Sequence, residues 1–161
     1  MKKGFTLIEL MIVIAIMGIL IAVGLNTFKT SQMRARDSRR KNDLRQIASA
    51  LEYYYNDKTT YPSSDASGNM YACGAAATAK CDWGSTPMSN TDPNPDTIYM
   101  VKLPDDPSSG RNYRYVKSCS SYKLYASLEM GSQDIDYNSS ISVTCDSVTC
   151  NYGIASSNTT P

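Results

Sequence analysis

The sequence predicts an α+β fold in which one long N-terminal α-helix packs on a small antiparallel β-sheet. Residues 5–25 are mostly apolar and carry a single charge, Glu9, and about 20 helical residues are enough to cross the core of a bilayer. Apolar residues then recur every three or four positions until about residue 57, which is typical of an amphipathic helix. From residue 99 the pattern alternates with period two and is rich in tyrosine, which indicates half-buried strands.

The long helix is expected over residues 5–57, about 80 Å if it is straight. Its first half is apolar on all sides and therefore needs lipid or other subunits around it. Its second half carries one apolar stripe, which we expect to face its own domain. Polar residues 56–58 and the Tyr61-Pro62 pair indicate where it ends. The stripe consists of Leu44, Ile47, Ala48, Leu51, Tyr54 and Tyr55.

The remainder of the chain begins with a predicted long connecting loop over residues 63–97, which is rich in Ser, Ala, Gly, Asn, Asp and Pro. Strands follow, separated by a Pro- and Gly-containing turn at residues 104–110. The second and third strands are expected to form a hairpin, and the last two a short second hairpin. The expected strands are residues 99–103, 111–117, 121–129, 140–145 and 148–154.

The composition argues against an enzyme. The chain has no histidine, which removes the commonest general base and the commonest zinc ligand, and it has no glycine-rich phosphate loop. We therefore expect no catalytic residue and no required cofactor. The net charge of +1 gives no global signal for nucleic acid.

One local basic segment stands out, because residues 29–45 hold seven Lys or Arg and two Asp. Anionic lipid headgroups or DNA phosphates are one interpretation. A solvated helix face with salt bridges to neighbouring subunits is favoured, because no aromatic residues are interleaved for stacking on bases. DNA binding is therefore an alternative that we do not favour.

All five cysteines lie in the second half of the chain, which indicates an oxidising, extracytoplasmic location for that half. Cys73 and Cys81 enclose a short loop and are predicted to form a local disulfide. A second disulfide is expected between two of Cys119, Cys145 and Cys150. Cys145 with Cys150 is the preferred pair, which would leave Cys119 as a buried strand thiol.

Residues 2–10, with the sequence Lys-Lys-Gly-Phe-Thr-Leu-Ile-Glu-Leu, resemble the class III signal sequence of type IV prepilins and pseudopilins. A conventional signal peptide is the alternative, but the apolar run is long for that role and a carboxylate lies inside it. The resemblance implies that a prepilin peptidase cuts after Gly4 and methylates the new amine of Phe5. It also implies that Glu9 meets the N-terminal amine of a neighbouring subunit during assembly.

This resemblance divides the chain into a leader, a membrane and filament-core helix, and an extracytoplasmic pilin domain, over residues 1–4, 5–28 and 29–161. It implies storage as a single-pass protein of the cytoplasmic membrane, in contact with lipid and with the domain outside. An assembly platform and its ATPase then build a helical homo-oligomeric filament. Many members of the family carry a proline where this chain has Asn26, so the extent of helix melting in the filament stays open.

A second resemblance links residues 103–107, Leu-Pro-Asp-Asp-Pro, and the tyrosine-rich residues 113–125 to the C-terminal domain of type II secretion major pseudopilins. In that family a calcium ion lies in the loop after the last tyrosine-rich strand. Asp134, Asp136 and Asn138 occupy that place here and alternate oxygen-bearing side chains, as a calcium loop requires. An ordinary polar turn is the alternative, because no acidic residue follows soon enough to act as a clear bidentate ligand.

The sequence therefore predicts a structural filament subunit, and two filament types remain open. The C-terminal region, which is rich in Ser and Thr and suited to disulfides, favours a surface pilin, as a major or a minor subunit. The similarity over residues 103–125 favours a periplasmic pseudopilin of type II secretion or of DNA uptake. We take the pilin as the prediction and the pseudopilin as the alternative.

Overall fold

The computed structural model describes residues 4–74, 79–90, 97–157 and 159–161. The first three residues of the expected leader and part of the expected 63–97 loop therefore lie outside the described residues. The side chains of Val23, Gly24 and Asn26 also lie outside them, although the helix backbone continues through these positions.

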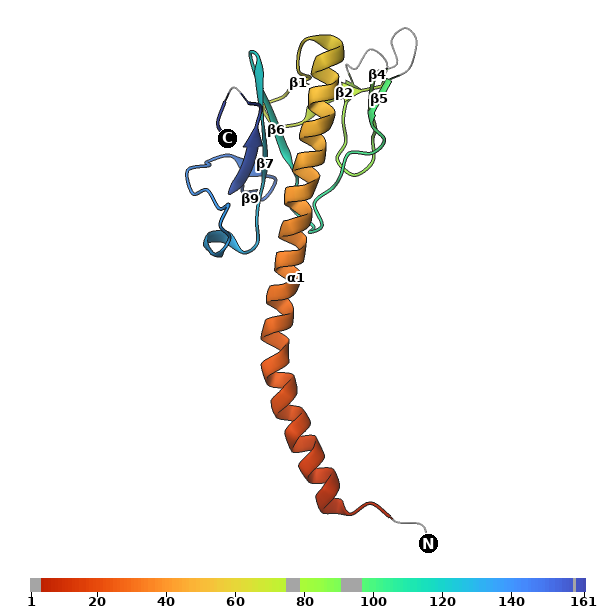
Figure 1. The fold of residues 1–161 in the computed structure, drawn as a ribbon, viewed down its shortest axis with the longest axis vertical. Coiled ribbons are helices and arrows are strands. Elements are labelled where there is room, and N and C mark those ends of the chain that lie inside the picture. Colours follow the sequence, from red (N-terminus) through yellow and green to blue (C-terminus); the bar gives the residue numbers. More distant parts are fainter. Residues whose placement is uncertain (1–3, 75–78, 91–96, 158) are drawn as a thin grey trace.

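The long helix α1 (Leu7–Lys58) runs without interruption from the N-terminal end into the domain. Figure 1 shows its first half projecting from the domain as a stalk and its second half lying among the strands. Thr6 is its N-cap, and Thr59 ends it in the left-handed conformation with φ 56°. The predicted helix and the α+β fold are confirmed, with the helix starting two residues later than expected.

The hydrophobic core forms where the amphipathic half of α1 meets the strands. Leu44, Ile47 and Leu51 are fully buried, and Tyr54 is nearly so. They pack in one cluster with side chains from the strands and loops, which include Met70, Met88, Leu103, Tyr115, Tyr122 and Leu124. The predicted stripe is therefore the buried face, except that Tyr55 at its edge stays 38 % exposed.

Within the described residues, the strands form four small antiparallel sheets. Three strands in the order β10-β7-β6 make the sheet beside α1, and a second three-stranded sheet has the order β1-β2-β3. The pairs β4-β5 and β8-β9 complete the domain. The elements are β1 (Ser63–Ser64), β2 (Met70–Cys73), β3 (Ala79–Lys80), β4 (Met88–Asn90), β5 (Thr97–Met100), β6 (Arg114–Ser118), β7 (Ser121–Ala126), the 3-10 turn η2 (Gly131–Gln133), β8 (Thr144–Cys145), β9 (Val148–Thr149) and β10 (Tyr152–Ala155).

The prediction of a plain loop over residues 63–97 was wrong, because β1 to β4 lie within it. These strands have two to four residues each and mixed polarity, so they carry no alternation long enough to recognise in a sequence. The strand predicted at residues 99–103 is also earlier, at Thr97–Met100, where it pairs with β4.

The β6–β7 hairpin lies where it was predicted, and the expected second hairpin is only partly present. β8 pairs with β9, but residues 152–155 leave that hairpin and join β7, with Tyr152 opposite Ala126. The Cys145–Cys150 disulfide closes the small hairpin early, so the following residues are available to cover the open edge of β7.

Candidate functional site

The N-terminal end of α1 holds the acidic residue of the candidate assembly site in a defined geometry. The Glu9 carboxylate oxygen Oε2 accepts hydrogen bonds from the backbone N–H of Thr6 at 2.9 Å and from its hydroxyl at 2.7 Å. The Thr6 hydroxyl in turn accepts a hydrogen bond from the Glu9 N–H at 3.3 Å. This reciprocal arrangement is a capping box, and it fixes the carboxylate at the positive end of the helix dipole.

Gly4 and Phe5, the residues expected at the processing site, precede the helix without regular secondary structure and are exposed. Phe5 is 82 % exposed, and a side-chain atom built at Gly4 would meet nothing within 4 Å. The peptide bond between them is therefore open on the surface of the subunit. Glu9 lies one helical turn further along, so the candidate processing and assembly residues are close together.

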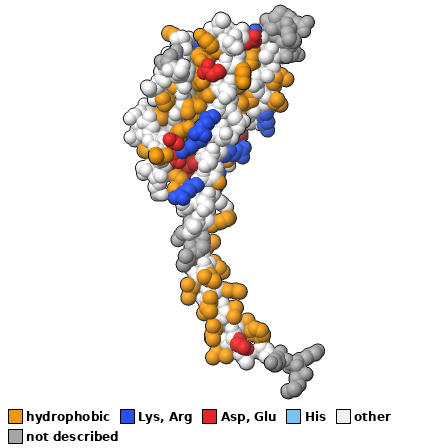
Figure 2. Space-filling view, viewed as in Figure 1, with side chains coloured by type: hydrophobic (Ala, Val, Ile, Leu, Met, Phe, Trp, Pro, Cys, Tyr) orange, Lys and Arg blue, Asp and Glu red, His pale blue; other side chains and the backbone are white. Residues whose placement is uncertain are grey.

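The stalk behind Glu9 exposes its apolar side chains. The large apolar residues from Phe5 to Phe28 whose side chains are described are between 40 % and 82 % exposed. Figure 2 shows hydrophobic side chains along the stalk and an acidic side chain near its lower end. By length and composition, α1 is the one helix among the described residues that could cross a membrane. Such a surface requires lipid or other helices around it.

A buried ion network ties the second half of α1 to the domain. The Arg40 guanidinium is completely buried and makes a bidentate contact with Asp106, at 2.7 Å through Nε and 2.6 Å through Nη2. Its Nη1 contacts Asp37 at 2.7 Å and Glu129 at 2.9 Å. Burial alone would lower the pKa of Arg40, and the hydrogen bonds to these carboxylates raise it well above the ordinary range.

The other members of the network attach the segment that follows β7 to the helix. Asp37 accepts hydrogen bonds from the backbone N–H groups of Glu129, at 2.9 and 3.0 Å, and Met130, at 2.9 Å. Glu129 also receives a bidentate contact from Arg36 and a hydrogen bond from Ser108. The hydrogen bond from Arg36 is the main reason that the pKa of Glu129 falls to about 2.

Sequence reasoning missed this network, although its signal was present. Asp37 and Arg40 continue the buried stripe of α1 at the same three- and four-residue spacing as Leu44 and Ile47. Charged residues at core positions indicate buried partners. The partner Asp106 belongs to the Pro-Asp-Asp-Pro turn, so that turn supplies the counter-charge to the helix.

Asp134 and Asp136, two of the candidate calcium ligands, lie together around a lysine. Lys41 Nζ lies 2.5 Å from Asp134 Oδ1 and 2.7 Å from Asp136 Oδ2, and 5.6 Å from the centre of the Tyr152 ring. Burial opposes the charge of Lys41, but the two carboxylates raise its pKa overall. Asn138 does not join this pair, because its side-chain oxygen accepts the backbone N–H of Ser140. The ammonium group therefore lies between the two carboxylates and compensates their charge, while calcium binding at this loop stays a prediction.

Part of the basic segment pairs within its own subunit, which the sequence did not predict, and the expected salt bridges to neighbouring subunits stay a prediction. Its buried or half-buried members form ion pairs within the same subunit, with Arg36, Arg40 and Lys41 each held by domain carboxylates. Arg39 makes a longer contact of 3.7 Å with Asp43. In the described parts of the chain no ion pair forms at the exposed Lys29, Arg34 or Arg45.

The cysteines form two disulfides, Cys73–Cys81 and Cys145–Cys150. The first closes the β2–β3 turn region, and the second closes the β8–β9 hairpin. The prediction of a buried strand thiol at Cys119 was wrong. This residue lies in the turn between β6 and β7 and is exposed, because the hairpin reverses one residue after β6 ends at Ser118.

Comparison with known proteins agrees with the candidate processing and assembly residues at the N-terminal end of α1. A family model for the prokaryotic N-terminal methylation motif matches residues 1–25. The chain is 36 % identical to the type II secretion system core protein G of Pseudomonas aeruginosa over 115 residues, which cover 71 % of this chain and 73 % of that protein.

Two pilins are similar over shorter stretches. The identity is 44 % with the fimbrial protein EcpC of Eikenella corrodens, over 44 % of this chain and 46 % of that protein. It is 42 % with the type IV major pilin protein PilA of Myxococcus xanthus, over 37 % of this chain and 27 % of that protein. The match therefore spans less than half the length of each of these two pilins. No solved structure gives a significant match.

Proposed function

The chain belongs to the family of type IV pilins and type II secretion pseudopilins, and we propose that within this family it is the pilin of a surface filament. It is a structural subunit with an apolar N-terminal helix that anchors it in a membrane before assembly. Catalysis forms no part of the proposal. We also propose the further steps, which are processing, extraction by an assembly platform with its ATPase, and display on the cell surface.

The observation that carries the proposal is the exposed apolar stalk with a single capped carboxylate at its end. A helix of this kind is stable in lipid, and it is equally stable when surrounded by the same helix from other subunits. The domain buries the other half of α1 with its own core and ion network. The stalk is therefore the part of the subunit that is left for contacts with other copies.

Glu9 can determine how neighbouring copies are staggered along the filament. Cleavage between Gly4 and Phe5 would create an amine at the end of each mature chain. Among the described residues Thr6 binds only Oε2 of the Glu9 carboxylate, and Glu9 is exposed, so Oε1 is not held by the capping box. A neighbour's amine that reaches this oxygen would remove much of the penalty of a carboxylate in an apolar environment. Assembly with that stagger is then favoured over other registers.

The test is the substitution Glu9→Val in the full-length chain, produced in cells that carry a matching assembly system. We expect normal membrane insertion, because the change removes an insertion penalty, which for a charge at the bilayer centre is about 2.5–3.5 kcal/mol and is smaller near the end of the span, where Glu9 lies. Filaments in the sheared surface fraction should fall at least tenfold. Ile8→Val is the matched control, since it also shortens an exposed side chain of the same helix turn but keeps the charge, and it should assemble normally. A normal filament yield from Glu9→Val would contradict the proposed role.

The second candidate is the major pseudopilin of a secretion system. It is favoured by the broad similarity to the secretion core protein G, which extends well beyond the N-terminal helix. The pilin is favoured by Lys41, which lies where the resemblance to the secretion family implies calcium. Deletion of the gene separates the two, because loss of surface filaments with normal protein secretion supports the pilin. Retention of secreted proteins inside the cell supports the pseudopilin.

A further inference from the structure

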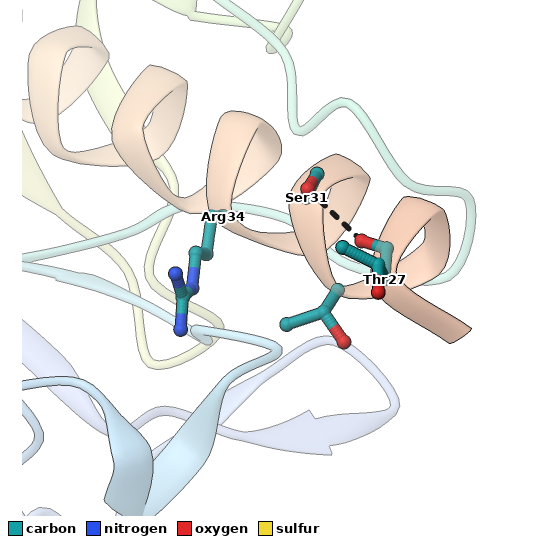
Figure 3. Close-up of a pocket in the computed structure, with 4 residues that line it drawn as sticks. Thr27, Ser31 and Arg34 are labelled. Atoms are coloured by element: carbon teal, nitrogen blue, oxygen red, sulfur yellow. Dashed lines mark hydrogen bonds between the residues drawn. The ribbon is translucent and has the colours of Figure 1, made fainter. Parts of the chain in front are cut away.

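The boundary between the apolar stalk and the domain carries a set of polar side chains that the filament contacts above do not use. Thr27, Thr30, Ser31 and Arg34 line a groove of about 320 Å³ along one side of α1. Figure 3 shows Thr27, Ser31 and Arg34 in a row, with the Ser31 hydroxyl donating a hydrogen bond to the Thr27 carbonyl at 2.9 Å and the Arg34 side chain extended away from the helix.

The position of this groove relative to a membrane follows from the helix geometry. Phe28 is exposed and apolar, and the helix from Leu7 to Phe28 has a length of about 33 Å, which matches a bilayer core of about 30 Å. Lys29 follows at once, and Arg34 lies about 9 Å beyond Phe28 along the axis. The headgroup layer is about 5–8 Å thick on each side, and long cationic side chains extend toward it. Both cations are therefore at the level of the lipid phosphates.

The charges at this level are of one sign. After Glu9 the next acidic residue in the sequence is Asp37, which is buried and already bonded to Arg40 and to the end of β7. In the described residues neither Lys29 nor Arg34 forms an ion pair. Figure 2 shows Lys and Arg side chains at the lower end of the domain, next to the stalk. Arg36, two residues beyond Arg34, is by contrast held by Glu129.

We propose that Lys29 and Arg34 bind the phosphates of anionic phospholipid headgroups on the domain's side of the membrane while the subunit is stored there. Arg34 binds in the hydroxyl-lined groove, and Lys29, five residues away and therefore on another side of the helix, meets a second headgroup. The contact fixes how deeply the stalk sits and is broken when the subunit is extracted. It rests on the proposed membrane storage, although it is measured without any assembly.

The experiment uses the full-length chain in nanodiscs that contain equal amounts of phosphatidylglycerol and phosphatidylcholine. Lipids that stay with the ejected subunit are counted by native mass spectrometry. We expect enrichment of phosphatidylglycerol on the wild type, and a roughly fivefold loss of that enrichment for each of Lys29→Ala and Arg34→Ala, which corresponds to about 1 kcal/mol per cation near an anionic surface. Arg34→Lys keeps the charge and should keep most of the enrichment.

Arg45→Ala is the matched control. Arg45 is an exposed arginine eleven residues after Arg34, on the same side of the helix, and about 16 Å further from the membrane. It should leave the enrichment unchanged. An equal loss with Arg45→Ala, or no enrichment on the wild type, overturns the proposal. Displacement of the lipid by millimolar inorganic phosphate also overturns it, because the site would then be one for free phosphate.

Filament yield is measured separately in cells. If Lys29→Ala and Arg34→Ala lower the yield but leave the lipid preference intact, the two cations contact neighbouring subunits and the lipid proposal fails. If Glu9→Val assembles normally while the lipid preference holds, the assembly proposal fails and the lipid contact stands.

Discussion

Replacement of Arg40 by methionine would test whether the buried ion network holds the helix to the domain. Methionine has a similar length and keeps the packing, but it leaves Asp37, Asp106 and Glu129 without the buried cation that they share. Removal of one partner from a buried ion pair costs about 3–5 kcal/mol, because the remaining charge is left uncompensated. Arg36 still compensates Glu129, so the loss should come mainly from Asp37 and Asp106.

The assay is urea unfolding of a soluble domain that begins at Lys29, which keeps all the contacts of the network, since they lie between Arg36 and Met130. A loss of 3–5 kcal/mol is a large part of the usual 5–15 kcal/mol of a domain. With a slope near 2 kcal/mol per molar urea, the midpoint should fall by about 2 M. Arg45→Met is the control, because the exposed Arg45 should change stability by less than about 0.5 kcal/mol.

The pH dependence provides an independent check on the same domain. The pKa of Glu129 is about 2 in the folded protein against 4.5 ordinarily, mainly through the hydrogen bond from Arg36. A carboxylate with a lowered pKa stabilises the fold above its ordinary pKa and loses that contribution as the pH falls toward the folded value. The domain should therefore lose about 3 kcal/mol of stability between pH 4.5 and 2 from this group.

In the urea experiment, an unfolding midpoint for Arg40→Met equal to that of Arg45→Met would refute the stabilising role of the Arg40 network.

Three further outcomes follow from the structure. Intact-mass spectrometry of the mature protein should show Phe5 as the first residue with one methyl group; a chain that begins after residue 20 would contradict the assignment. Iodoacetamide without denaturant should label a single thiol, at the exposed Cys119, because the other four cysteines form disulfides. Millimolar calcium should leave the melting temperature of the domain unchanged relative to chelator, because Lys41 already lies between Asp134 and Asp136; a shift of several degrees would return calcium to the loop.

The features that could be predicted from the sequence are those encoded locally. The helix follows from the run of apolar residues and from the spacing of Leu44, Ile47 and Leu51, and the β6–β7 hairpin follows from alternation over several residues. Both disulfides close short loops, so spacing favoured both pairs, although it left Cys119 open as a partner in the second. In each case the interacting residues are near one another in the chain.

The features that could not be predicted depend on distant segments. Arg40 binds Asp106, which is 66 residues further along the chain, and no pattern within α1 indicates which acidic turn will pack against it. Similarly, β10 covers the edge of β7 because the preceding hairpin ends early, and Lys41 meets Asp134 only once η2 has folded back against α1. Sequence periodicity gives the buried face of an element, whereas the partner of a buried charge is decided by the tertiary fold.

The two halves of α1 together explain how one subunit can be stable in two surroundings. The domain is complete by itself, because its core and its ion network use only the second half of the helix. The stalk is then free to exchange lipid for neighbouring stalks. Since lipid tails are about as apolar as leucine side chains, the hydrophobic effect hardly distinguishes the two surroundings.

The difference in free energy between membrane and filament therefore comes from the two ends of the stalk. At Glu9 a carboxylate in lipid is penalised, by less than the roughly 2.5–3.5 kcal/mol of a charge at the bilayer centre, and in the proposed filament a neighbour's amine would relieve this. At Lys29 and Arg34 the proposed headgroup contacts favour the membrane by about 1 kcal/mol each. In the proposed scheme the two ends of the stalk therefore act in opposite directions: Glu9 favours the filament, and the headgroup contacts must be broken before a subunit can enter it.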